Sequence, residues 1–445
     1  VHHSRAMMDW RQLLSTQRFG HGDAEPGAPA RTAFQKDWDR VVFSSAFRRL
    51  QDKTQVHSLP ESDYVRTRLT HSMEVSSVGR SLGAAIGQVV IERQPRLAAQ
   101  AQAADFGHIA AAACLAHDIG NPPFGHFGED TIRHWFADPL GGAGFLAGLN
   151  PAERGDLLGF EGNAQGFRIL TRLQNWRDEG GLRLTAATLA TFTKYPRSAT
   201  SPATGTPKFG IFQAEQPLFA AVAEAVGLPR REPGDDDAWC RHPLAYLVEA
   251  ADDICYRVVD LEDGFKLGRI RFDEAEALLL ALVGEAPPRY RSIQEAPRRI
   301  AYLRAKAIGR LVDAVVEVFL DREAALMAGA PEGELLRQTP QAAVLARIAD
   351  LTAREVFETR ERYEIEVAGV EILTVLLSSF AQAVFEPAAG GKRSPRARAL
   401  LELLPEPPVQ GPPYDRLLQI TDYVSGMTDS YALTQFRRLK GLLAT

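Results

Sequence analysis

The sequence predicts an all-α fold. Long segments carry apolar residues at the spacing of amphipathic or buried helices, whereas the alternation that is typical of strands is rare. The chain has 445 residues, of which 45% are hydrophobic and 24% charged, as in ordinary globular proteins. A chain of this length can bury a large core, and it contains no internal repeat and no glycine-rich phosphate-binding loop.

Charge, apolar runs and cysteines exclude several classes of protein. The net charge of -5 is not that of a protein built to coat nucleic acid. No apolar run approaches the roughly 20 residues of a membrane span, and no signal-peptide pattern is present, so we expect no membrane contact and a cytoplasmic location. Cys114, Cys240 and Cys255 form no CxxC pair, which argues against a disulfide framework or a structural zinc site.

Two segments precede the first long helical pattern. Residues 1–30 are rich in glycine and proline and predict an N-terminal arm, of which residues 1–6 have the composition of an expression-tag remnant. Residues 39–53 then predict an amphipathic helix with a basic side. For Lys53 on that side, a solvated surface position and a functional role stay equally open.

The next helix is predicted over residues 71–93. Thr70 is a suitable N-cap, and His71 then lies in the first turn. A single histidine at a helix start is more often structural than a ligand, so a functional interpretation depends on further ligands elsewhere in the chain. Arg68 lies shortly before this histidine and is long enough to reach a phosphate bound beside it.

The most informative segment is residues 109–126. Ile109–Ala116 is small and apolar on every face, as in a buried helix, and Gly120 and a following proline pair end it. His117 and Asp118 therefore lie on its last turn, where burial is costly unless a partner such as a divalent metal ion is present. Neighbouring positions on a helix differ by about 100° in direction, so other helices must supply the remaining ligands.

A new helix is predicted to open at residue 125. It places His126 and Glu129 one helical turn apart, so their side chains are neighbours. A carboxylate that holds and orients an imidazole suits a general acid; the alternative is a His–Glu pair on the surface. Residues 161–166, Glu-Gly-Asn-Ala-Gln-Gly, begin a further helix that is expected to shape the same region.

A later helix carries a polar stripe. Residues 242–243, His-Pro, start it, and Asp252, Tyr256 and Asp260 follow at i, i+4 and i+8 on one face. Polar groups in a row on a mostly apolar helix require partners, either a bound ligand or arginines of a neighbouring helix. Asp253 points about 100° away and is the alternative to Asp252.

The remaining segments are less informative. Residues 182–192 predict an apolar helix that leads into Lys194 and Tyr195. Residues 272–380 predict amphipathic helices without a chemical motif. Residues 386–413 hold seven prolines and a basic run and predict a solvated loop, with subunit contact or nucleic-acid binding as alternatives.

These segments together resemble the HD superfamily of metal-dependent phosphohydrolases. Within it, four motifs resemble the dGTPase-like dNTP triphosphohydrolases: Arg-Thr-Arg-Leu-Thr-His-Ser at 66–72, His-Asp-Ile-Gly-Asn-Pro-Pro-Phe-Gly-His at 117–126, Glu-Gly-Asn-Ala-Gln at 161–165 and Glu-Ala-Ala-Asp-Asp at 249–253. The resemblance extends in order from about Arg40 to residues 425–432. It implies an HD phosphohydrolase core over residues 31–270 with inserted loops, and a helical region over 271–445 that completes the core and makes oligomer contacts.

The resemblance also implies roles for individual residues. A divalent metal (Mn, Mg, Co, Ni or Fe) is expected on His71, His117, Asp118 and Asp252. His126, held by Glu129, is expected to act as the general acid. Tyr256 is expected to pack against the sugar or base, and Asp260 to accept a sugar hydroxyl. The complete set of implied substrate contacts is Arg49, Gln51, Arg68, Lys194, Tyr195, Tyr256 and Asp260.

The implied reaction is hydrolysis of a dNTP, with dGTP expected, by attack of metal-bound hydroxide on the α-phosphate. The products are then a deoxynucleoside and inorganic triphosphate. The implied partners, besides the substrate, are an activating dNTP, a single-stranded nucleic acid and further copies of the chain in a homo-oligomer. Two alternatives stay open: hydrolysis of another nucleotide phosphoester, and a nucleotide or single-stranded nucleic-acid sensor whose HD site is inactive.

Overall fold

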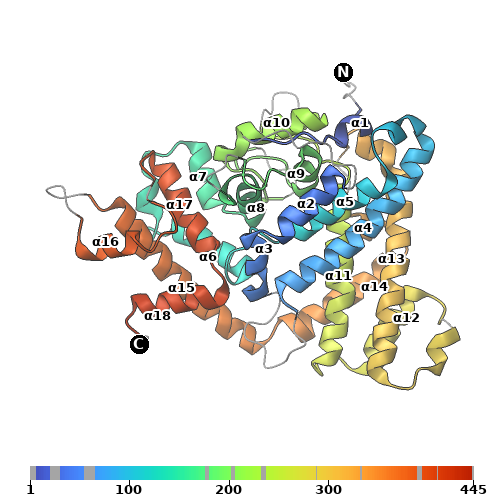
Figure 1. Cartoon of the computed structure of the whole chain (residues 1–445). Helices are drawn as coiled ribbons and strands as arrows, with labels where there is room; N and C mark the ends of the chain where they lie inside the picture. The colour runs from blue at the N-terminus through green and yellow to red at the C-terminus, as the bar shows by residue number, and fades with distance from the viewer. Residues whose placement is uncertain are drawn as a thin grey trace.

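The computed structural model describes residues 7–20, 31–54, 66–175, 180–201, 206–231, 237–286, 288–330, 333–387, 393–407 and 409–442. Within these residues it contains eighteen α-helices and four isolated β-bridges but no β-strand, which confirms the all-α prediction (Figure 1). The predicted arm 1–30 and the proline-rich stretch 386–413 lie partly outside the described residues.

Two hydrophobic cores organise the helices. The first is formed by α1 (Trp10–Leu13), α2 (Ala33–Val42), α3 (Ser45–Arg49), α4 (Arg68–Arg93), α5 (Ala103–Ala116), α9 (Ala186–Phe192), α10 (Gln216–Val226), α11 (Ala245–Lys266), α12 (Phe272–Val283), α13 (Ala296–Met327) and α14 (Ala342–Thr352). The second is formed by α6 (Gly125–Ala137), α7 (Pro151–Leu158), α15 (Arg360–Phe385), α16 (Pro395–Leu401), α17 (Pro413–Ser425) and α18 (Asp429–Leu439), and α8 (Gly162–Arg168) contributes to both. Helices from both sides of residue 270 occur in each core, and the division at that residue stays a prediction.

Helices α4 and α5 lie against each other at the centre of the first core. Gly79, Gly83 and Gly87 repeat at every fourth position of α4 and face α5. A Cβ atom at Gly83 would lie 2.5 Å from the carbonyl oxygen of Phe106, so only glycine permits this approach. The close packing fixes the start of α4 relative to the end of α5, where the histidines of interest lie.

The structure corrects the predicted starts of two helices. Helix α4 begins at Arg68 and not at residue 71, because Thr67 is the N-cap and exchanges hydrogen bonds with Thr70 in a capping box. Helix α11 begins at Ala245, after Leu244, rather than at residues 242–243. Thr67 and Thr70 are both suitable capping residues for α4, and the local sequence alone does not distinguish between them.

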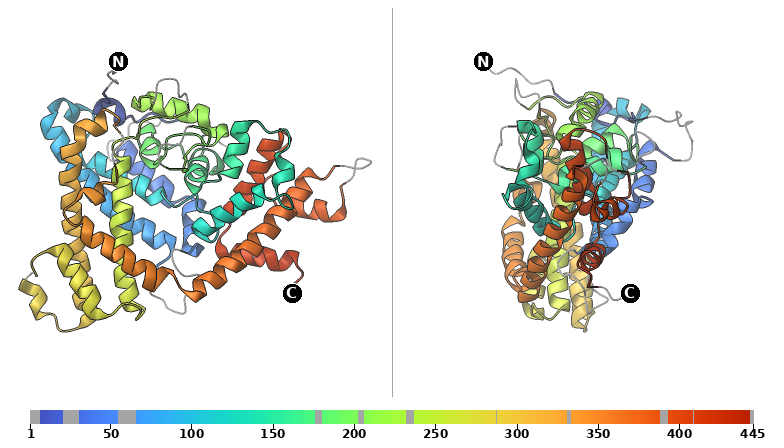
Figure 2. Two further views of the ribbon diagram at one scale, coloured as in Figure 1. Left: turned by 180° about the vertical axis from the view of Figure 1, so that it is seen from behind. Right: turned by 90° about the vertical axis from the view of Figure 1, so that its left-hand side faces the viewer.

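Helix α15 bears on the expectation that the chain contains no membrane span. The most apolar 18-residue window within its segment Arg362–Phe385 has a mean hydropathy of 1.7, and among the described helices this one alone is long and apolar enough to cross a membrane. Glu366 and Glu371 interrupt the apolar run, so a search for unbroken runs misses it. The helix packs against α6, α16, α17 and α18 and extends along one side of the molecule from the first core to the second (Figure 2). It therefore serves as a core helix.

Asp156 is one of the acidic side chains that the helices of the second core bury. Its carboxylate accepts hydrogen bonds from the hydroxyl of Tyr414 and from the backbone N–H of Gln213, the latter at 2.6 Å. Burial nevertheless raises the pKa of Asp156 to about 7. This carboxylate is therefore a titrating group of the fold that lies outside the cavities described below.

Candidate active site

Three helices bring His71, His117 and Asp252 together. The Nε2 atom of His71 lies 2.9 Å from Oδ1 of Asp252, and Nε2 of His117 lies 3.6 Å from the same oxygen. One ligand atom from each residue lies within 4.8 Å of the other two, and no other such group occurs among the residues that the structure describes. Two imidazole nitrogens and a carboxylate oxygen are donors that first-row divalent ions accept. These residues fit a divalent metal ion.

The orientation of His117 supports this fit. The residue is the C-cap of α5, and its Nδ1 atom lies 2.7 Å from the carbonyl oxygen of Cys114. A backbone carbonyl can only accept, so Nδ1 carries the proton and the lone pair of Nε2 is free to bind a metal.

Asp118 lies beside this group but its oxygens have other partners. Its Oδ1 atom is 3.6 Å from Nε2 of His117 and accepts a 2.6 Å hydrogen bond from the Asn121 amide, while Oδ2 accepts one of 2.7 Å from Arg68. Burial opposes ionisation, but the positive charge of the adjacent Arg68 guanidinium holds the pKa of Asp118 far below its ordinary value. The carboxylate is therefore charged and available as a fourth ligand.

These residues line a cavity of about 260 Å³. Arg68, His126 and Tyr256, which the sequence pointed to, also line it. The ring of Tyr256 stacks on Phe357 at 5.4 Å between centroids and 3° between planes. The cavity therefore combines charged and aromatic side chains.

Sequence reasoning missed several residues of this cavity, among them Thr54, Phe124, Phe357, Arg362 and Glu366. The last three lie in residues 272–380, where the amphipathic pattern carried no chemical signal. Phe124 has φ of +63°, which is uncommon for a residue with a side chain. The proline pair before it was the available sign of an unusual turn.

His126 and Glu129 meet as their spacing predicted. Nδ1 of His126 lies 2.8 Å from Oε2 of Glu129, whose Oε1 accepts a 2.6 Å hydrogen bond from the N–H of Gly162. Burial opposes ionisation of Glu129, but the hydrogen bond with His126 lowers its pKa below the ordinary value. A Cβ atom at Gly162 would lie 2.6 Å from oxygens of both Glu129 and Asn121, so this position requires glycine.

Several predicted substrate contacts do not line this cavity. Gln51 accepts a hydrogen bond from Thr67, the Lys194 ammonium lies 2.9 Å from the Glu249 carboxylate, and Tyr195 lies under the Arg241 guanidinium. Their contact with a nucleotide stays a prediction.

The aspartates of α11 differ in their surroundings. Asp252 belongs to the metal-binding group, whereas Asp253 lines a different cavity of about 430 Å³ near Arg257. Asp260 is buried, which raises its pKa well above the ordinary value, and its Oδ2 has no hydrogen-bond partner within the described part of the chain. The geometry thus favours Asp252 over Asp253 as a ligand, and the sugar contact of Asp260 stays a prediction.

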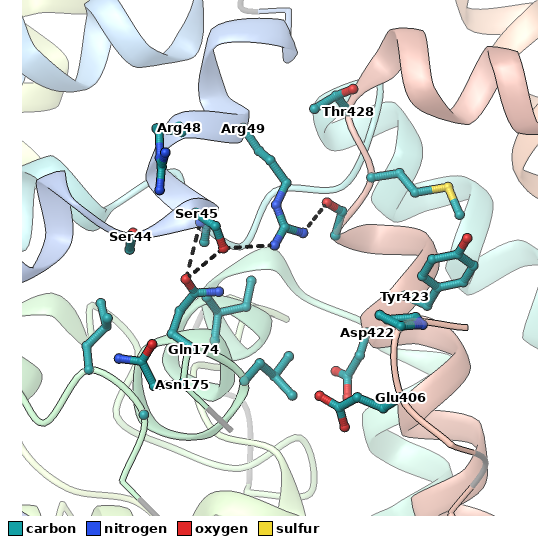
Figure 3. A pocket seen from close by; sticks show the side chains of 18 of the residues that line it. Ser44, Ser45, Arg48, Arg49, Gln174, Asn175, Glu406, Asp422, Tyr423 and Thr428 are labelled. Atoms are coloured by element: carbon teal, nitrogen blue, oxygen red, sulfur yellow. Dashed lines mark hydrogen bonds between the residues drawn. The ribbon is translucent and has the colours of Figure 1, made fainter. Parts of the chain in front are cut away.

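Arg49 lies in a second, larger cavity of about 1310 Å³ between α3 and the turn that joins α17 to α18 (Figure 3). It donates a 2.8 Å hydrogen bond to the carbonyl oxygen of Gly426 and one of 3.3 Å to the hydroxyl of Ser45. Arg40, Arg48 and Arg183 also line this cavity. Arg49 therefore lines a separate pocket, in which four arginines occur together with Glu406 and Asp422.

Comparison with known proteins agrees with this geometry. Residues 68–144 match the family model of the HD domain. The chain is 44% identical over 450 residues to a deoxyguanosinetriphosphate triphosphohydrolase-like protein of Pseudomonas aeruginosa, covering 98% of this chain and 99% of the relative. It is 46% identical over 452 residues to a protein of the same name from Synechocystis, covering 98% and 100%. It is 32% identical over 510 residues to the deoxyguanosinetriphosphate triphosphohydrolase of Serratia proteamaculans, covering 97% and 99%.

Proposed function

Because the chain belongs to the HD-domain family of deoxyguanosinetriphosphate triphosphohydrolase-like proteins, we propose that it is a metal-dependent enzyme that hydrolyses dNTPs, with dGTP as the expected substrate. The products are the deoxynucleoside and inorganic triphosphate. The observation that carries the proposal is the meeting of His71, His117 and Asp252 at a cavity that also contains Arg68. A metal site next to a buried arginine suits a phosphate ester.

The proposed metal ligands are His71, His117, Asp118 and Asp252. Their nitrogen and oxygen donors suit Mn, Mg, Co, Ni or Fe, and no thiolate is present to favour a closed zinc site. A divalent ion bound there lowers the pKa of a coordinated water and so makes hydroxide available at neutral pH. The tautomer of His117 and the charged state of Asp118 prepare the site for such an ion.

The chain's own charged residues assist the bond cleavage. Arg68 faces the cavity from beside Asp118 and offsets the negative charge of the polyphosphate. As the bond between the α-phosphorus and the 5′ oxygen breaks, His126 gives its proton to that oxygen. Glu129 holds the imidazole through Nδ1, which leaves Nε2 for this transfer.

The aromatic side chains of the cavity suit the nucleoside. Tyr256 and Phe357 offer stacked rings against which a sugar or base can pack. Glu366 lies at the same cavity, paired with Arg362 at 2.8 Å, and its carboxylate can accept from the exocyclic amino group of guanine. Asp260 remains the proposed acceptor for a sugar hydroxyl, and its unpartnered oxygen supports this.

An activating dNTP has a candidate site in the larger cavity. Arg40, Arg48, Arg49 and Arg183 line it, and guanidinium groups bind phosphates. Assaying Arg48→Ala with single and mixed dNTPs tests this site. We expect stimulation by a second dNTP to be lost while basal turnover is retained. Salt-sensitive binding of a labelled oligonucleotide that depends on the same arginine would instead assign the cavity to single-stranded nucleic acid.

The reaction is tested by separating the products after incubation with Mn²⁺ and each of the four dNTPs, alongside GTP. We expect deoxynucleoside and triphosphate in equal amounts from the wild type and neither from His117→Ala. Release of inorganic phosphate, or turnover of another phosphoester alone, would replace the proposal with the first alternative. Absence of turnover and of bound metal, with tight nucleotide or oligonucleotide binding, would favour the sensor.

We also infer a cytoplasmic homo-oligomer. Cys114, Cys240 and Cys255 are all buried free thiols, which suits a reducing compartment. Long helices with broad apolar faces often associate. Light scattering after size exclusion measures the number of subunits, and a monomer at assay concentrations would contradict the inference.

A further inference from the structure

The turn between α17 and α18 contains a buried acid that the proposed reaction does not use. This acid is Asp429, the first residue of α18, whose exposed fraction is 8%. It lies in the segment 425–432, which ends the family resemblance, and it does not line the catalytic cavity itself.

Both oxygens of Asp429 bind segments that do line that cavity. Oδ2 accepts hydrogen bonds from the N–H of Thr54 at 3.0 Å and from its hydroxyl at 2.7 Å. Oδ1 accepts one from the N–H of Phe124 at 3.0 Å. One carboxylate thus joins two cavity-lining segments that are distant in sequence.

The first of these segments determines where α4 starts. Thr54 forms an isolated antiparallel bridge with Thr67, and the N–H of Arg68 donates to the carbonyl oxygen of Lys53 at 3.3 Å. Lys53 in turn is buried and donates to carbonyl oxygens of both Asn121 and Ser425. The backbone of Arg68 therefore follows the position of Thr54.

The second segment supports the guanidinium of the same arginine. Phe124 and Gly125 have φ of +63° and +61°, so two successive residues have the left-handed backbone conformation. Residues with a side chain rarely adopt this conformation. A Cβ atom at Gly125 would lie 2.5 Å from Nη2 of Arg68, so the guanidinium rests against the backbone of this turn. The hydrogen bond from Phe124 to Asp429 helps to hold the turn in this conformation.

We propose that Asp429 is a positioning residue that fixes Arg68 from both sides, by its backbone through Thr54 and by its guanidinium through the turn at Phe124. Asp429 acts without touching the substrate. The inference rests on the proposed function, in which Arg68 contacts the polyphosphate. It predicts that substitution of Asp429 lowers kcat only as far as displacement of Arg68 lowers it.

The chemistry of the contacts requires a carboxylate. Three donors converge on Asp429, and an ionised carboxylate offers acceptors only. In Asp429→Asn the amide NH2 must face either the Thr54 donors or the Phe124 N–H. One side of the contact is therefore lost although the side chain keeps its shape.

The test measures steady-state triphosphate release by Asp429→Asn, Arg68→Ala and the double variant. A displacement of about 1 Å at a reacting group can cost roughly 100-fold in rate, so we expect kcat to fall about 10- to 100-fold in Asp429→Asn, with KM changed less than about threefold. In the Arg68→Ala background the same substitution should change kcat less than about twofold. Asp415→Asn, the same change in the first turn of α17 and away from both cavities, is the matched control.

Two further measurements separate positioning from folding. Mn²⁺ affinity and the melting temperature should stay near wild type in Asp429→Asn while kcat falls. Should that variant fail to fold, Asp429→Ser, whose short hydroxyl side chain can still accept a hydrogen bond, takes its place. Wild-type kinetics in Asp429→Asn, or an undiminished loss in the Arg68→Ala background, would overturn the inference. A wild-type protein that releases no triphosphate from any dNTP would instead overturn the proposed function.

Discussion

The turn that carries His117 and Asp118 depends on a backbone contact that one methyl group should break. A Cβ atom at Gly120 would lie 2.6 Å from Cα of Gly166 and closer still to the carbonyl oxygen of Gly162. All of these are backbone atoms of α8, so no side chain can rotate away. In Gly120→Ala the end of α5 and the start of α8 must therefore separate.

The size of the effect follows from the distances. Carbon atoms pack best at about 3.5–4.0 Å, so the two backbones must separate by roughly 1 Å. Overpacking of this kind typically costs about 1–3 kcal/mol of stability. The displaced turn also carries two of the proposed metal ligands, and a shift of about 1 Å can cost roughly 100-fold in rate. We expect a lower melting temperature together with a fall in kcat of about 100-fold.

The measurements are thermal unfolding, Mn²⁺ affinity and triphosphate release. Gly309→Ala is the matched control, because Gly309 is exposed on α13 and its added Cβ would have no neighbour within 4 Å. That control should gain about 0.4–1 kcal/mol from the restricted unfolded chain and keep its activity. A Gly120→Ala protein with the melting temperature and kcat of the wild type would refute the reasoning.

Three further predictions concern the metal, a buried acid and the general acid. Mn²⁺ at 100 times its Kd should stabilise the wild-type fold by about 2.7 kcal/mol and should hardly change the stability of His71→Ala. A wild-type melting temperature that does not change on addition of Mn²⁺ would contradict the metal site. Burial raises the pKa of Asp156 to about 7, so the folded protein binds a proton that the unfolded chain releases, and stability is lost as the pH rises from about 4 to 7. Asp156→Asn should therefore raise the free energy of unfolding by at most roughly 4 kcal/mol at pH 8, and raise the melting temperature there but not at pH 4; an equal effect at both pH values would show that titration is not the cause. Glu129→Gln should lower kcat about 10- to 100-fold with unchanged Mn²⁺ affinity, and unchanged kcat would exclude His126 as a general acid that this carboxylate holds.

Local sequence determined the helices and the contacts within one helical turn. Apolar periodicity, glycine and proline predicted the all-α fold and a helix end near Gly120. The prediction kept His117 and Asp118 on the last turn of that helix, whereas α5 ends at Ala116, His117 is its C-cap and Asp118 lies in the following turn. The pairing of His126 with Glu129 followed from their i, i+3 spacing and is present in the structure. These features depend on backbone geometry over a few residues, which any chain with this local sequence shares.

The tertiary structure alone decided how distant residues meet. His71 and Asp252 are 181 residues apart and Phe124 and Asp429 are 305 apart, and no periodicity specifies such contacts. The same packing placed Arg49 in the larger cavity, although its neighbours in sequence lie close to Arg68. It also brought Phe357 and Glu366 to the catalytic cavity from a region without a recognisable motif. Such contacts depend on how closely helices such as α4 and α5 approach and at what angle, and the complementary shapes of many buried side chains determine both.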